Sequence, residues 1–116
     1  MEALDFRANA VSPVKPEHVS VLERTIAAIH GAEPIFRSTT HVRETFRGET
    51  IWDGPVYTFD LAGHPTAVRC YGLACRVEGS EEVEFITVLG ESGVVSPQAA
   101  VRVFVAPRLK NRPATK

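Results

Sequence analysis

The sequence predicts an α+β fold in two layers: an N-terminal helix, a four-stranded antiparallel meander and a short C-terminal helix. Apolar residues recur every three to four positions near both ends of the chain, which indicates two amphipathic helices. Between them lie four strand-like segments separated by short turns. Short connections favour antiparallel neighbours. We expect both helices to cover one face of the sheet and to leave the other face open.

The first helix is expected over residues 16–30. Pro16 suits the first helical position, where the missing N–H costs nothing. Gly31 provides the stop. One apolar stripe is formed by Val19, Leu22, Ile26 and Ile29.

The first two strands are expected over residues 36–47 and 50–61. In the first strand, one set of alternate residues is mostly apolar or small. The other set contains the cations and predicts a basic face exposed to solvent. The cations of this face are Arg37, His41, Arg43 and Arg47. In the second strand, Asp53-Gly54-Pro55 predicts a bulge or kink near a sheet edge, because proline cannot donate to a strand ladder.

The third strand, over residues 67–77, is apolar or small on both faces and is expected to be central. The fourth is expected over 82–89. Ser96 caps a second helix that begins at Pro97 and is expected to end near Ala106, before Pro107. We therefore expect one domain over residues 16–106, preceded by a flexible arm (1–15) and followed by a basic tail (107–116).

Composition restricts the class of protein. The chain has 116 residues, of which 44% are hydrophobic and 23% charged, and this suits one globular domain. No apolar run approaches the roughly 20 residues that span a bilayer, and the N-terminus lacks the layout of a signal peptide. We expect a soluble, cytoplasmic protein that does not associate with membranes. The net charge of −1 argues against a strongly basic nucleic-acid binder.

The cysteines and histidines of the sequence do not form the pattern of a metal site or of a catalytic nucleophile. Cys70 and Cys75 lie five positions apart in one strand, so they face opposite sides and are expected to remain reduced thiols. Together with His41 and His64 they lack the close ligand pairs of zinc sites. Both cysteines also lie away from a helix N-terminus, which would lower a thiol pKa. We expect no metal and no cofactor, and a non-enzymatic role is favoured over an enzymatic one.

The favoured function is a binding or accessory module that acts through the open face of the sheet, with a protein partner or a second copy in a homodimer. One alternative is nucleic-acid binding through the basic strand face and the tail. Another is a small-molecule binder or small enzyme, whose pocket lies between the first helix and a curled sheet and is lined by Glu44, Tyr57 or His64. The candidate binding residues are Arg37, His41, Arg43, Arg47, Arg108, Lys110 and Arg112.

Overall fold

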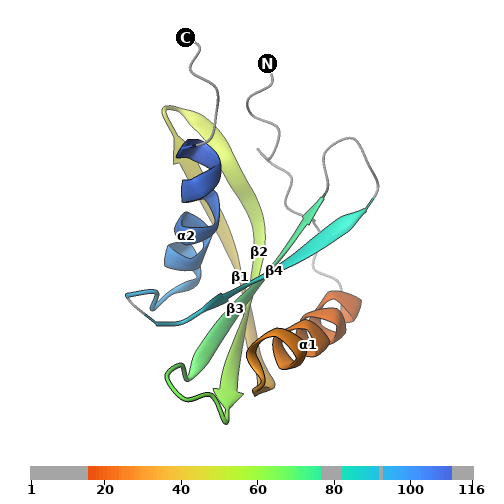
Figure 1. The fold of residues 1–116 in the computed structure, drawn as a ribbon. Coiled ribbons are helices and arrows are strands. Elements are labelled where there is room, and N and C mark those ends of the chain that lie inside the picture. Colours follow the sequence, from red (N-terminus) through yellow and green to blue (C-terminus); the bar gives the residue numbers. More distant parts are fainter. Residues whose placement is uncertain (1–15, 77–81, 92, 111–116) are drawn as a thin grey trace.

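A computed structural model describes residues 16–76, 82–91 and 93–110. The elements are α1 (Pro16–His30), β1 (Glu33–Phe46), β2 (Glu49–Ala62), β3 (Arg69–Arg76), β4 (Val83–Leu89) and α2 (Pro97–Lys110). The strands form one antiparallel sheet in the order β1-β2-β3-β4, so β3 is central and β1 is an edge (Figure 1). The predicted α+β class, the element order and the meander are confirmed. The predicted arm (1–15) and residues 111–116 of the predicted tail lie outside the described residues.

Helix α1 has the predicted bounds and packs through part of its predicted stripe. Leu22 and Ile26 are fully buried, whereas Ile29 is largely exposed near the end of the helix. Gly31 follows with a φ of 64°, and its N–H donates to the Ala27 carbonyl at 3.1 Å. A left-handed glycine directly after the last turn is the usual C-terminal stop of a helix.

The two helices lie on opposite faces of the sheet, and β3 shows how the core is divided. Cys70 belongs to the apolar cluster that contains Leu22 of α1. Its neighbour Tyr71 belongs to a second cluster, which contains Val101 and Phe104 of α2. Successive strand residues point to opposite faces, so α1 and α2 cover different faces, and Figure 1 shows the twisted sheet between them.

The expectation of one covered face and one open face is therefore wrong. Strand β2 carries large apolar side chains on both parities, with Tyr57 and Phe59 toward α1 and Val56 toward α2. Each set must be removed from water, because burial of apolar surface is the main stabilising contribution to folding. One helix on each face satisfies both sets.

Two bulges adjust the pairing of β1 with β2. Phe36 pairs with Phe59 and Ser38 with Thr58, so Arg37 is the additional residue in β1. Further along, Glu44 pairs with Trp52 and Thr45 with Thr50, so Ile51 is the additional residue in β2. A bulge lets adjacent residues face the same side, which explains why Ile51 and Trp52 both lie in the α2-side cluster.

The predicted irregularity at Asp53–Pro55 does not occur, because these residues pair with β1 without a shift. The predicted nearby edge does occur. Pairing of β2 with β3 begins only at Val56, so Pro55 lies beyond the end of that ladder. A residue with no N–H is tolerated where no ladder partner requires one.

Helix α2 extends beyond the predicted end at Ala106. Pro107 lies inside the helix, which continues to Lys110. A proline removes one backbone hydrogen bond and strains the preceding turn, but Phe104 and Val105 anchor this turn in the core. At the other end, the Ser96 hydroxyl accepts the Ala99 N–H at 3.1 Å, which confirms the predicted cap.

Candidate binding surface

The outer edge of β1 is the most accessible part of the sheet. Every residue from Ile35 to His41 is exposed, and β2 pairs with only one side of the strand. An edge strand carries backbone N–H and C=O groups with no neighbouring strand. This stretch offers main-chain hydrogen-bonding groups to a further strand.

A groove of about 320 Å³ runs along this edge. It is lined by residues 40–43 of β1 and by residues 96–98 at the beginning of α2. Four consecutive residues of a strand alternate between its two faces. The groove therefore follows the β1 backbone beside the beginning of α2, and β2 pairs with one edge of this strand. The volume is at the lower end of the range for ligand pockets, roughly 300–1,000 Å³.

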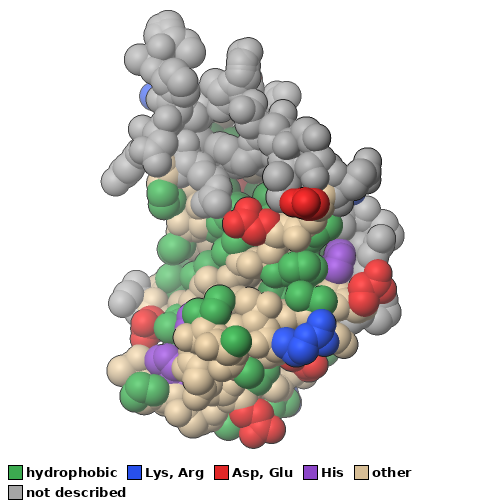
Figure 2. Space-filling view, turned by 45° about the vertical axis from the view of Figure 1, so that its right-hand side comes forward, with side chains coloured by type: hydrophobic (Ala, Val, Ile, Leu, Met, Phe, Trp, Pro, Cys, Tyr) green, Lys and Arg blue, Asp and Glu red, His purple; other side chains and the backbone are tan. Residues whose placement is uncertain are grey.

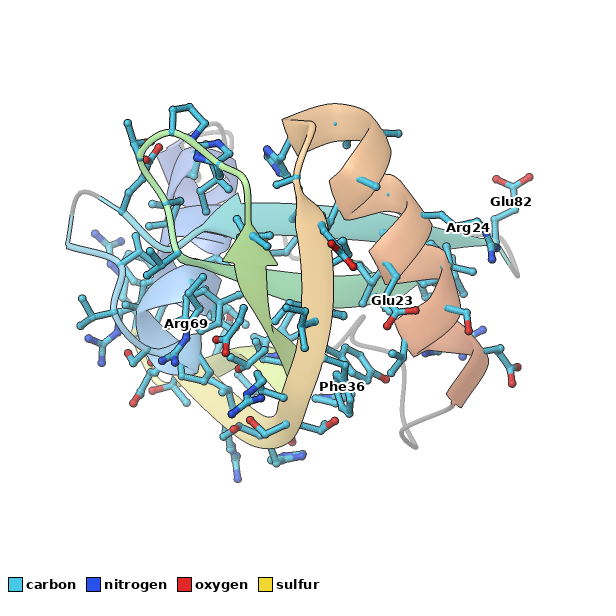
Figure 3. All side chains as sticks on the ribbon, turned by 90° about the horizontal axis from the view of Figure 1, so that it is seen from below. Glu23, Arg24, Phe36, Arg69 and Glu82 are labelled. Atoms are coloured by element: carbon cyan, nitrogen blue, oxygen red, sulfur yellow. The ribbon has the colours of Figure 1, made fainter. Side chains whose placement is uncertain are left out.

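The predicted basic face is divided between the two faces of the sheet. Arg37, in the bulge, ion-pairs with Asp60 at 3.2 Å, and Arg69 approaches the same carboxylate at 3.4 Å. His41 instead contacts Asp53. Asp53 and Asp60 are an odd number of positions apart with no bulge between them, so they face opposite sides. Figure 3 shows Arg69 on the α2 side of the sheet and Phe36 on the α1 side.

Arg43 and Arg47 are the two cations of β1 and its turn that have no acidic partner within the described residues. The Arg43 guanidinium donates to the Thr50 hydroxyl at 3.1 Å. The Arg47 guanidinium lies 5.0 Å from the centre of the Phe46 ring, and its backbone has a φ of 54° in the β1–β2 turn. Neither contact cancels the positive charge, so both side chains attract anions.

Glu44 links β1 to α2 through side-chain hydrogen bonds and an ion pair. Its side chain is only 11% exposed and accepts hydrogen bonds from Gln98 and from Arg102, the latter at 3.1 Å. Gln98 and Arg102 are four positions apart and so share one face of the helix. Sequence analysis named Glu44 only as a residue that could line a pocket, and it missed both partners. The spacing of Gln98 and Arg102 was visible in the sequence, whereas the strand they face was not.

The three residues predicted to line one pocket lie in three different environments. Tyr57 is fully buried on the α1 side, with its hydroxyl 3.4 Å from His18 Nδ1. Glu44 lies on the α2 side. His64 lies in the β2–β3 connection, where its Nδ1 accepts the backbone N–H of Thr66 and of Ala67. These side chains do not line a common cavity.

The two cysteines lie on opposite faces as predicted and form no disulfide. Burial raises the pKa of the Cys70 thiol to about 11, so Cys70 is almost entirely protonated near neutral pH. Within the described ranges, no three His, Cys, Asp or Glu side chains gather in a way that could hold a metal ion.

The remaining predicted binding residues are at the C-terminus. Arg108 and Lys110 belong to the backbone of α2 rather than to a tail. Their side chains, and the whole of Arg112, lie outside the part of the chain that can be described. On the face drawn in Figure 2, the coloured side chains include no continuous patch of Lys and Arg. Neither described helix is long and apolar enough to cross a membrane.

No known protein family, no curated protein and no solved structure matches this chain significantly.

Proposed function

We propose that this protein is a non-enzymatic binding module whose β1 edge takes an extended segment of a partner protein as an additional strand. The groove between β1 and the beginning of α2 is the observation that carries this proposal. In strand addition, main-chain hydrogen bonds provide affinity, and pockets for alternate side chains provide specificity. The exposed edge from Ile35 to His41 and the adjoining groove supply these two components.

Three polar side chains at the groove, those of Ser96, Gln98 and His41, are engaged in contacts within the protein. The Ser96 hydroxyl caps α2 through the Ala99 N–H, and Gln98 donates to Glu44. His41, which contacts Asp53, is the candidate base at the groove. The nucleophilic side chains that line the groove are the hydroxyls of Thr40 and Ser96, and neither is hydrogen-bonded to His41 within the described residues. An activated nucleophile requires a base within hydrogen-bonding reach. Binding is therefore better supported than catalysis.

A partner of different sequence is favoured over a second copy. In a symmetric dimer each β1 edge would face an identical edge. A symmetric pairing centred on the groove-lining residues 40–43 would place Arg43 opposite Thr40, so its charge would face no acidic side chain, whereas a partner of different sequence can supply one. Nucleic acid is also less favoured, because Arg37, Arg69 and Arg102 already have carboxylate partners.

The test is selection from a displayed library of random dodecapeptides with the full chain as bait. Selected peptides should protect the backbone amides of residues 38–43 from hydrogen exchange. An N-methyl scan of one selected peptide should then weaken binding at every second position, because only alternate N–H groups of an added strand face β1. No selected peptide, protection elsewhere, or no such alternation would contradict strand addition.

The oligomeric state is measured in parallel by native mass spectrometry of the protein alone. A monomer is expected. A dimer in which the same amides of β1 are protected without peptide would show that a second copy occupies the edge, and would overturn the choice of a different partner.

A further inference from the structure

We infer that the segment bound at β1 places an acidic side chain beside Arg43 and an apolar side chain in the groove against Val42 and Pro97. This inference rests on the proposed strand addition and specifies the chemistry of the partner. Neighbouring residues of an added strand point to opposite faces. The residue beside Arg43 and the residue beside Val42 therefore meet two different environments.

Arg43 is an exposed cation that forms no ion pair within the described residues. Among the described residues, its guanidinium donates only to the neutral Thr50 hydroxyl. Arg47 follows in the adjoining turn, also without an acidic partner within the described residues. Asp53 lies opposite Arg43 in the β1–β2 ladder but contacts His41, so Arg43 forms no ion pair with it among the described residues and can meet an acid on the outer edge of β1. Opposite charges directly across a strand pair are stabilising, which favours Asp or Glu at this position of the partner.

The environment beside Val42 disfavours an acid. Val42 is almost fully buried in the α2-side cluster, and Pro97 provides a second apolar wall of the groove. The helix end offers few donors to an anion, because Pro97 has no N–H and the Ala99 N–H is bound by Ser96. The Gln98 amide, which lines the groove, already donates to the Glu44 carboxylate, and Arg102 is paired with the same carboxylate, so neither group is left to bind a second acid. A medium-sized apolar side chain is the better occupant.

The probes are four acetylated heptapeptides, of which the first repeats the alternation so that it can bind in any register. The first is Thr-Glu-Val-Glu-Val-Glu-Thr. The second replaces each Glu with Lys, the third replaces each Val with Ser, and the fourth is the isomer Thr-Glu-Glu-Val-Val-Glu-Thr, which breaks the alternation. Dissociation constants are measured by calorimetry at two salt concentrations. The first peptide should bind most tightly and should weaken with added salt, because exposed charge pairs are screened.

Charge reversal in the protein tests the position. Arg43→Glu should reverse the preference between the Glu and Lys peptides, with a change of about fivefold for each charge pair gained or lost. Arg24→Glu is the matched control, because Arg24 is exposed on the outer side of α1 and the variant has the same net charge (Figure 3). The control should keep the preference of the unmodified protein.

The outcomes separate this inference from the proposed function. Equal binding of all four peptides, with protection of residues 38–43, would overturn the acidic and apolar specificity and leave strand addition standing. If Arg24→Glu changes the preference between the Glu and Lys peptides as much as Arg43→Glu does, the acidic specificity at Arg43 is also overturned. Library peptides that protect β1 but carry no acidic residues would do the same. If no library peptide protects β1, strand addition itself is wrong and the inference fails with it.

Discussion

Leu22 fills the space that a side chain at position 72 would occupy. A Cβ built on Gly72 would lie 2.7 Å from Leu22 Cδ1 and 2.8 Å from Cδ2, both closer than Cβ contacts allow. Gly72 lies in the central strand and faces α1, so the missing side chain lets the helix approach the sheet at this point.

Gly72→Ala should therefore lower the free energy of unfolding by about 1–3 kcal/mol, because the added methyl overpacks a fully buried contact. In a Leu22→Ala background, itself costing about 2–5 kcal/mol, the same substitution should cost much less, since the space has been vacated. Urea denaturation of the four proteins measures this coupling, with Ser38→Ala on the exposed edge as a neutral control. Additive effects would show that the two residues do not compete for space.

Glu44→Ala should destabilise the protein by about 1 kcal/mol, because Gln98 and Arg102 both lose their acceptor. Arg102→Ala should cost less, since this exposed side chain leaves Gln98 bound to Glu44. Glu84→Ala is the matched control on an exposed position of β4. Equal stability of the Glu44 and Glu84 variants in thermal unfolding would contradict an anchoring role for Glu44.

The stability of the fold should decrease as the pH falls below about 6.5. Partial burial, followed by the neighbouring His64, lowers the pKa of His30, and Glu91 opposes this shift. The unfolded chain then binds the proton more readily than the folded one, so stability increases with pH between the folded pKa and the unfolded value of 6.5. Denaturation at pH 5 and pH 8 should show a smaller difference for His30→Asn. An unchanged difference would exclude His30 as a source of this dependence.

Cys70 should react slowly with iodoacetamide in the folded protein. A pKa raised from 9.0 to about 11 reduces the thiolate fraction by about a hundredfold, before steric exclusion is counted. Mass spectrometry of Cys75→Ala, in which Cys70 is the only thiol, measures the rate with and without denaturant. Rapid labelling of the folded variant would show that Cys70 is accessible and would reopen a role in catalysis.

Local patterns predicted the elements well. The proline start, the glycine stop and the spacing of Leu22 and Ile26 predicted α1 with the bounds that the structure has. The small and apolar third strand was correctly predicted to be central, because a strand buried on both faces needs such residues on both parities. The end of α2 was predicted too early, since core contacts of Phe104 and Val105 outweigh the local cost of Pro107.

The candidate site was predicted only in part. Arg37, His41 and Arg43 were identified from their alternation, but the bulge at Arg37 places it on the face opposite His41. A one-residue insertion in a ladder depends on the partner strand and has no reliable signature in a single strand. The groove was missed for a related reason, because it joins residues 40–43 to residues 96–98, which are distant in the chain.

The sequence by itself determined the helices, the strands and their antiparallel order, because periodicity, turn residues and short connections act over a few neighbouring residues. Only the tertiary structure decided that the helices lie on opposite faces, that Glu44 is held by Gln98 and Arg102, and that β1 presents its edge beside a groove. These outcomes depend on which face of the sheet each helix covers. Strand β2 carries apolar side chains on both faces, so each face needs a helix to remove them from water.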